Sequence, residues 1–155
     1  MLQSKGFTIV ELMIVVIIVA ILASLAIPSF QSMIERRRLI GAAEAVYSDL
    51  QFAKSEALKT NVSVNAKIEG GGTDWCFKVA EVNSVCGTSF PGVSKALEDG
   101  FSVTFQPIRG TSGNDSFVFS FGSNQIKVIV STLGRIKLCV PPGVSMVGGY
   151  PSCPP

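Results

Sequence analysis

The chain has 155 residues, enough for one globular domain beside a membrane segment, and its formal net charge of +2 indicates no class of partner. It contains no histidine, which excludes a Ser-His-Asp or a Cys-His catalytic arrangement. The glycines at 70–72 are followed by Thr-Asp and not by Lys-Ser/Thr, which favours a turn over a phosphate-binding loop. We therefore expect a protein that is not an enzyme, with no cofactor and no metal site.

The first element is an apolar segment over residues 7–30. Between Phe7 and Ile27 the only ionisable side chain is Glu11, so about 20 nearly continuous apolar residues can cross the hydrocarbon core as a helix. The alanines at 23 and 26 leave a cleavable secretory signal peptide as the alternative, because such signals end in small residues.

The residues before this segment carry a specific pattern. A short polar leader, residues 1–6, ends in Lys5-Gly6 and is followed by Phe7, with Glu11 five residues after the glycine. This arrangement resembles the class III signal of type IV pilins and type II secretion pseudopilins. The resemblance implies that a prepilin peptidase cuts between Gly6 and Phe7, that Phe7 is then N-methylated, and that the apolar helix stays in the mature protein.

Glu11 admits two interpretations. A carboxylate at the centre of a spanning helix costs roughly 2.5–3.5 kcal/mol, so such a group usually has a partner. The resemblance implies that Glu11 pairs with the charged N-terminus of a neighbouring subunit during assembly. Alternatively, because Glu11 lies one turn from the helix end, its side chain extends to the lipid headgroups.

A second helical segment follows over residues 31–60. Pro28 lacks a backbone donor and is expected to kink a helix that otherwise continues to about Lys59. Apolar residues recur at steps of three and four and predict one buried stripe: Leu39, Ala43, Val46, Leu50, Ala53 and Ala57. The run Arg36-Arg37-Arg38 can contact anionic headgroups or polyanions, or it is a solvated flank of the membrane segment.

From Asn61 the apolar period changes to two, which predicts strands. About six antiparallel strands are expected, in one or two sheets whose apolar face packs on the helix stripe, near 62–68, 75–79, 101–105, 117–121, 126–130 and 136–140. The fold class is α+β, with residues 61–155 forming a β-rich globular domain.

All four cysteines lie in this domain: Cys76, Cys86, Cys139 and Cys153. An even number of cysteines in a small exported domain favours two disulfides. Because each would close a short local loop, we predict the pairs Cys76–Cys86 and Cys139–Cys153. The alternative is a zinc site with four thiolate ligands, but the paired C-x2-C spacing of such sites is absent.

The end of the helix and the first strands, residues 50–64, together with Trp75, resemble the GspH/FimT family of minor pilins and pseudopilins. The resemblance implies a pilin fold and a minor pilin of a type IV pilus, in the tip or priming complex. It implies a single-pass protein of the bacterial inner membrane with a periplasmic domain, which enters a filament with other major and minor pilins. A minor pseudopilin of type II secretion is the alternative.

The segment from Ser131 to Cys139 holds two cations, Arg135 and Lys137. If Ile136 and Leu138 point inward, a period of two places both cations on the outer strand face, and a Cys139–Cys153 bond would hold Tyr150 nearby. Cations suit the phosphates of double-stranded DNA, and an aromatic ring can stack on an exposed base. Gly134 and Arg135 resemble the Gly-Arg-x-Arg element of DNA-binding FimT-type pilins, with Lys137 at its second arginine. Alternatively, this is an ordinary strand with two exposed cations.

Overall fold

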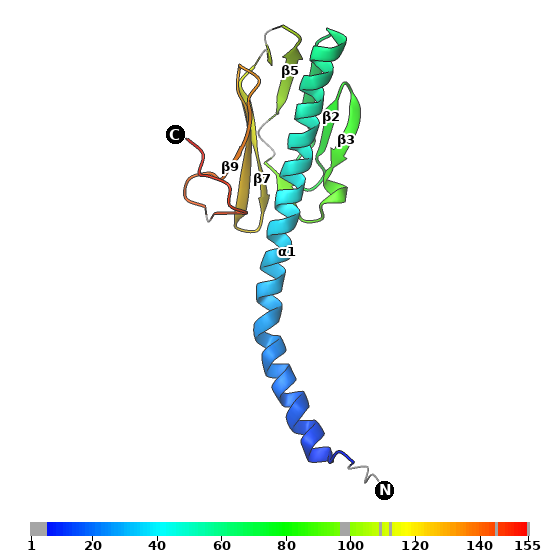
Figure 1. The fold of residues 1–155 in the computed structure, drawn as a ribbon, viewed down its shortest axis with the longest axis vertical. Coiled ribbons are helices and arrows are strands. Elements are labelled where there is room, and N and C mark those ends of the chain that lie inside the picture. Colours follow the sequence, from blue (N-terminus) through cyan, green and yellow to red (C-terminus); the bar gives the residue numbers. More distant parts are fainter. Residues whose placement is uncertain (1–5, 97–99, 109, 112, 145, 155) are drawn as a thin grey trace. The chain divides into compact units, whose positions relative to one another are not determined.

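The structure is a computed structural model that describes residues 6–96, 100–108, 110–111, 113–144 and 146–154. The helix α1 runs from Ile9 to Thr60, and β-strands follow it as far as Cys139 (Figure 1). The chain divides into two compact units, Met1–Ile34 and Glu35–Pro155. The predicted helix is confirmed, and it continues through Pro28.

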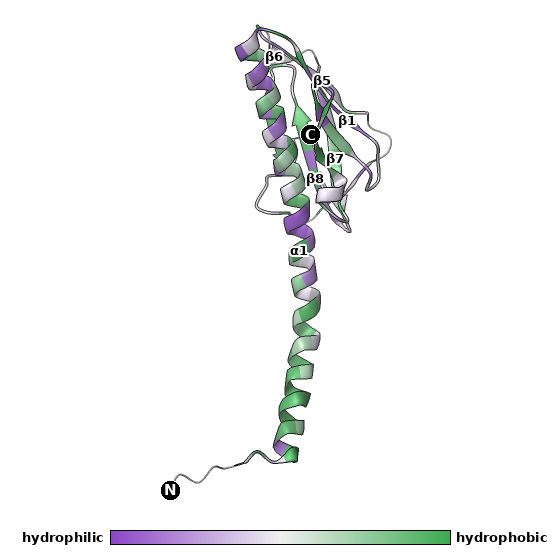
Figure 2. Ribbon diagram, turned by 90° about the vertical axis from the view of Figure 1, so that its right-hand side faces the viewer, coloured by the Kyte–Doolittle hydropathy of each residue, from purple (hydrophilic) through white to green (hydrophobic). Residues whose placement is uncertain are grey.

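The first unit contains the N-terminal half of α1. Its large apolar side chains are exposed all round the helix, from Ile9 at 79% to Ile27 at 56%. Figure 2 shows this half of α1 in the green of hydrophobic residues, whereas the second half mixes both colours. By length and composition α1 can cross a membrane. The kink expected at Pro28 stays a prediction.

The second unit contains the C-terminal half of α1, which is amphipathic. All six residues of the predicted stripe are fully buried: Leu39, Ala43, Val46, Leu50, Ala53 and Ala57. Ala42 is also fully buried beside them. The helical period of the apolar residues therefore identifies the face of α1 that packs on the strands.

The first sheet has the order β3-β2-β1-β5-β6, with all neighbours antiparallel. Its strands are β1 (Val64–Glu69), β2 (Cys76–Val79), β3 (Val82–Cys86), β5 (Ser102–Gln106) and β6 (Gly110–Thr111). The second sheet is also antiparallel and has the order β4-β7-β8-β9. Its strands are β4 (Ser94–Lys95), β7 (Asp115–Phe121), β8 (Asn124–Val130) and β9 (Ile136–Cys139). A short 3-10 helix, η1 (Gly87–Ser89), follows β3.

One core joins the helix to both sheets. Five of its buried aromatic side chains form one chain of ring contacts, namely Trp75, Phe77, Phe101, Phe117 and Phe119. The rings of Trp75 and Phe119 lie 4.5 Å apart between centroids. The indole Nε1 of Trp75 donates to the carbonyl oxygen of Val93 at 3.0 Å, so the polar atom of the largest core side chain has a partner.

The six predicted strands are all present, and the described residues contain three more, β3, β4 and β6. Strands β4 and β6 have two residues each, too short to show a period. β3 was missed because its turn from β2 has no glycine: Ala80 and Glu81 adopt positive φ angles of 50° and 67°. Such turns normally carry Asn-Gly or Asp-Gly, which tolerate this conformation.

Candidate functional site

The site predicted for processing lies directly before α1. Gly6 and Phe7 are exposed, and the Phe7 side chain is 80% exposed. The remaining leader residues, 1–5, lie outside the described residues. Thr8 caps the helix, because its Oγ1 accepts a hydrogen bond from the backbone N–H of Glu11 at 3.2 Å. The bond that a peptidase would cut is therefore in an accessible, non-helical segment two residues before a well-defined helix start.

Glu11 lies in the first turn of α1 and is exposed. A negative side chain there is favourable, because the first backbone N–H groups of a helix carry a partial positive charge. No ion pair of Glu11 occurs among the described residues of this single chain. Its carboxylate is thus accessible to a cation from another molecule or to lipid headgroups.

The cations of the predicted DNA-binding strand lie where the period of two places them. Arg135 and Lys137 are exposed, whereas Ile136 between them is buried. The register adds Lys127: Lys137 pairs with Ile129, and Cys139 pairs with Lys127. Since paired residues of an antiparallel ladder share a face, Lys127 lies on the same outer face. We call these three side chains, Lys127, Arg135 and Lys137, the basic face.

The basic face has no acidic neighbour on its own strands. Between residues 115 and 140 the only acid is Asp115, at the start of β7. Its carboxylate accepts hydrogen bonds from the backbone N–H groups of Ser102 at 2.9 Å and Ser116 at 2.8 Å. Among the described residues no ion pair involves the basic face. The positive charge of this surface is therefore not compensated locally.

Two disulfides, Cys76–Cys86 and Cys139–Cys153, are present, as the spacing of the cysteines predicted. The described cysteines include no free thiol, so none of them can serve as a thiolate ligand of zinc in this structure. Cys139 shares the strand face of Lys137 by the period of two, but it is 3% exposed because the C-terminal tail covers it. The backbone N–H of Val140 donates to Pro151, and that of Cys153 donates to Val140. The tail thus lies against the end of β9.

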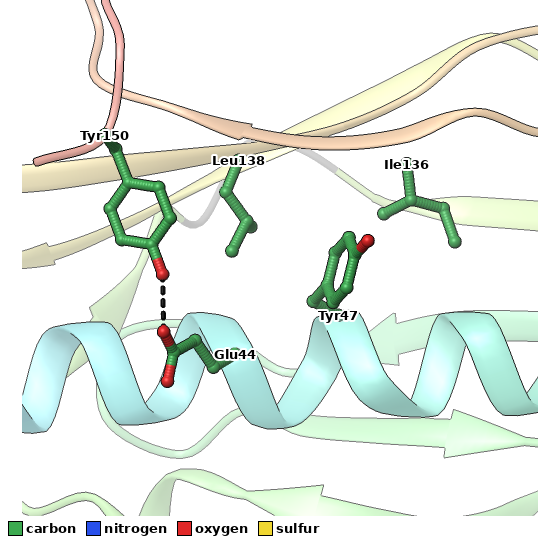
Figure 3. A pocket seen from close by; sticks show the side chains of 5 residues that line it. All are labelled: Glu44, Tyr47, Ile136, Leu138 and Tyr150. Carbon is green, nitrogen blue, oxygen red and sulfur yellow. Dashed lines mark hydrogen bonds between the residues drawn. The ribbon is translucent and has the colours of Figure 1, made fainter.

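The prediction that Tyr150 lies beside the two cations is wrong. Tyr150 turns toward α1, where its hydroxyl donates to Glu44 Oε1 at 2.5 Å (Figure 3). It lines a hollow of about 470 Å³ with side chains from α1 and from the inner face of β9, namely Glu44, Tyr47, Ile136 and Leu138. Burial and the nearby Glu44 raise the pKa of Tyr150 to about 12. The ring is therefore on the strand face opposite the basic face.

The tail backbone does pass the basic face, although its aromatic ring does not. Lys137 lines a second hollow of about 530 Å³ together with tail residues Pro151 to Pro154. In β7 the phenylalanines at 117 and 119 are buried, so their rings lie on the inner face of the sheet. Phe121 has the same alternation and lies on that face too. On the described strands β7 to β9 the outer face therefore presents cations with serine, valine, glutamine and isoleucine side chains, but no aromatic ring for base stacking.

A family model described as "Type II transport protein GspH" matches residues 42–134, more than half of the chain. The chain belongs to the GspH family. A second model, "Prokaryotic N-terminal methylation motif", matches residues 1–27. This GspH-family chain therefore has the N-terminal motif of type IV pilin-like proteins, and its resemblance to minor pilins is confirmed.

Relatives of this GspH-family chain are fimbrial proteins. It is 30% identical to fimbrial protein EcpC of Eikenella corrodens over 138 residues, and this match covers 77% of this chain and 83% of EcpC. It is 29% identical to the type IV major fimbrial protein FimA of Dichelobacter nodosus, over 72% of this chain and 71% of FimA. A fimbrial protein of Moraxella nonliquefaciens is 41% identical over 61 residues, which span only 34% of that protein.

The fold of this GspH-family chain has a solved counterpart. The type IV minor pilin FimU of Pseudomonas aeruginosa matches with a TM-score of 0.50 and 18% identity, over 73% of this chain and 96% of the FimU chain. At this identity the likeness concerns the fold alone. The pilin fold expected from the sequence is thus confirmed.

Proposed function

We propose that this GspH-family protein is a minor pilin of a type IV pilus. It is anchored in the bacterial inner membrane by residues 7–30, with its globular domain in the periplasm, and a prepilin peptidase cuts it between Gly6 and Phe7. The observation that carries the proposal is the N-terminal half of α1, which exposes apolar side chains all round and carries Glu11 as its single ionisable residue. Such a surface suits first lipid and then the apolar interior of a filament.

Mass spectrometry of the protein purified from its native membrane tests the processing step. The expected N-terminus is Phe7, with one added methyl group. Intact protein starting at Met1, or a cut near Ala26, would show that the segment is an ordinary anchor or a signal peptide. A variant with Gly6→Leu should remain uncut and still be anchored, because the apolar helix is unchanged.

Glu11→Ala tests the assembly role. We expect the globular domain to stay folded and the variant to reach wild-type levels in membranes, but to be reduced in sheared filaments, because the change removes a partner for a neighbouring N-terminus. Glu35→Ala is a matched control, since it removes a carboxylate from α1 outside the apolar segment. If both variants enter filaments like the parent, Glu11 serves only as a carboxylate at the headgroups.

Two observations bear on whether this protein works in a type IV pilus or in type II secretion. The matching family is described by type II transport, which favours a minor pseudopilin, whereas the relatives are fimbrial proteins, which favours a pilus. We favour the pilus, with the protein in the tip or priming complex. Deleting the protein should then reduce the number of pili and leave the secretion of type II substrates unchanged. The opposite result would assign it to secretion.

DNA binding is a second candidate function, supported by the basic face and its lack of local acids. Its three cations would contact phosphates, which gives affinity without sequence preference. Since no aromatic ring accompanies them, binding should not favour single strands. Neutralising three phosphates predicts a slope of log affinity against log salt of about −2.7, and a dissociation constant near the roughly 10⁻⁴–10⁻⁶ M of non-specific binding.

A soluble fragment of residues 31–155, which contains the whole core, allows the DNA test. The triple variant Lys127→Gln, Arg135→Gln, Lys137→Gln should lose salt-dependent binding of duplex DNA and keep its melting temperature. A control with the same charge change replaces three exposed cations of α1, namely Arg36, Arg37 and Lys59. If the control loses binding and the triple variant does not, DNA contacts the arginine run instead, and if the parent does not bind, the candidate function fails.

A further inference from the structure

An apolar groove lies between α1 and the hairpin of β2 and β3. It has a volume of about 310 Å³ and is lined mainly by apolar side chains, namely Phe52, Val64, Val79 and Val82. Phe52 is 56% exposed and Val82 is 69% exposed, unusually high fractions for large apolar groups beside a cavity. Ser84 Oγ donates to Asp49 Oδ2 at 2.7 Å, which fixes the hairpin to the helix and makes the groove a preformed feature.

The rim of this groove is acidic. Glu56 is one of its lining residues, and the Asp49 carboxylate lies two helical turns before it. Glu81, at the tip of the hairpin, forms an ion pair with Lys67 at 2.8 Å. Among the described residues no ion pair involves Glu56. A ligand for this groove should therefore be apolar and carry a positive charge beside its apolar part.

The same chain presents an element of that chemistry at the turn from β8 to β9. Leu133 lies at the tip of this turn and is 70% exposed, and Arg135, two residues further along, is also exposed. The turn is well fixed: the Gly134 N–H donates to Ser131 at 2.8 Å, and Lys54 Nζ on α1 donates to the Gly134 carbonyl at 2.9 Å. A φ of 68° at Gly134 suits glycine and makes the turn tight. We call Leu133 with Arg135 the knob.

The groove and the knob lie on opposite flanks of α1. Lys54 bonds to Gly134, in the turn that carries the knob, and Glu56 lines the groove. Two positions along a helix correspond to about 200° around its axis. Figure 1 shows the same arrangement, with β9 on one side of α1 and β2 and β3 on the other. A second copy placed beside the first could therefore present its knob to the groove without either copy changing shape.

We propose that the groove binds the knob of a second copy of this chain, with Leu133 between Phe52 and Val82 and with Arg135 facing Glu56. The two surfaces differ, so the contact is head to tail and leaves a free groove at one end and a free knob at the other. Copies can then be added in one direction. Arg135 becomes shielded in such a contact, whereas Lys127 and Lys137 are not part of it.

Cross-linking of the full-length chain in its native membrane tests this contact. Two differently tagged copies are co-expressed, one with Val82→Cys and the other with Leu133→Cys, and mild oxidation should join them. The control pair combines Leu58→Cys with Leu133→Cys, because Leu58 is a 56% exposed apolar residue of α1 that does not line the groove. No excess of the joined product over this control, or joining only to other pilins, would overturn the proposal.

A charge exchange gives a second, independent test. Arg135→Glu or Glu56→Arg alone should lower the yield of joined copies roughly tenfold, since each places like charges opposite one another, and the two changes together should restore it. In co-purification of tagged copies without added cysteines, Leu133→Asp should lower the recovery of the partner copy by a similar factor. If a cysteine variant does not accumulate, co-purification of the tagged copies carrying only the charge changes decides the matter. Failure of the double change to restore association contradicts the contact.

Discussion

Removing the Cys139–Cys153 disulfide should destabilise the globular domain by a predictable amount. The bond joins residues 14 apart in the sequence, so it closes a loop of about 15 residues in the unfolded chain. The loss of closure entropy for such a loop corresponds to roughly 3 kcal/mol at 25 °C. In the folded state the tail keeps other attachments, namely the buried side chain of Val147, the Tyr150–Glu44 hydrogen bond and two backbone hydrogen bonds at Val140.

The double variant Cys139→Ala, Cys153→Ala should therefore fold with its tail in place, but its free energy of unfolding should be lower by about 3 kcal/mol. For a domain of this size the melting temperature should fall by about 10–15 °C. The assay is urea unfolding of the 31–155 fragment followed by circular dichroism. The pair Cys76→Ala, Cys86→Ala is the control, because its bond joins residues 10 apart and should be worth nearly as much.

The outcome that would refute this reasoning is a loss below about 1 kcal/mol for the tail variant and a large loss for the control. Constraint of the unfolded chain would then not be the main contribution of either bond. A tail variant that loses more than 5 kcal/mol would be equally informative. It would mean that the disulfide holds the tail in place, and that the contacts of Val147 and Tyr150 depend on it.

Three further predictions concern single contacts. The fold raises the pKa of Tyr150 to about 12, so the contribution of its neutral hydroxyl to stability is complete below about pH 10 and is lost as the pH rises toward 12. Tyr150→Phe should therefore flatten the profile of stability against pH between these values, measured by brief urea unfolding. An unchanged profile would mean that the Tyr150 hydroxyl has no such environment. Replacing Ala80-Glu81 with Asn-Gly should raise the free energy of unfolding in urea by roughly 0.5–1 kcal/mol, since both positions have a positive φ that Asn and Gly tolerate better. A lower free energy of unfolding would show that the ion pair of Glu81 outweighs the backbone strain. Trp75→Phe should cost roughly 2 kcal/mol through a lost buried hydrogen bond and a cavity, and a neutral result in the same assay would argue that the core closes around the smaller ring.

Local periodicity explains which parts of the fold could be predicted. The stripe on α1 repeats every three to four residues, and the strands that show a clear alternation were all found, because burial on one face leaves a period in the sequence itself. The disulfides were found for a related reason: short loops bring their cysteines together with little loss of chain entropy. β3 escaped because the turn before it, Ala80-Glu81, carries no residue that marks a turn.

By itself, the sequence determined the helix with its apolar half, the position of Glu11, the α+β class and the placement of Arg135 and Lys137 on one strand face. Each depends on neighbours a few residues away, and the helix and strand periods alone fix them. Only the tertiary structure decided that Lys127 joins those cations, because strand register depends on pairing across the sheet. It also decided that Tyr150 points away from them, through a hydrogen bond to a residue 106 positions earlier in the chain. A disulfide fixes where the tail is attached, but the hollow beside α1, which no local pattern describes, decides which way its aromatic ring turns.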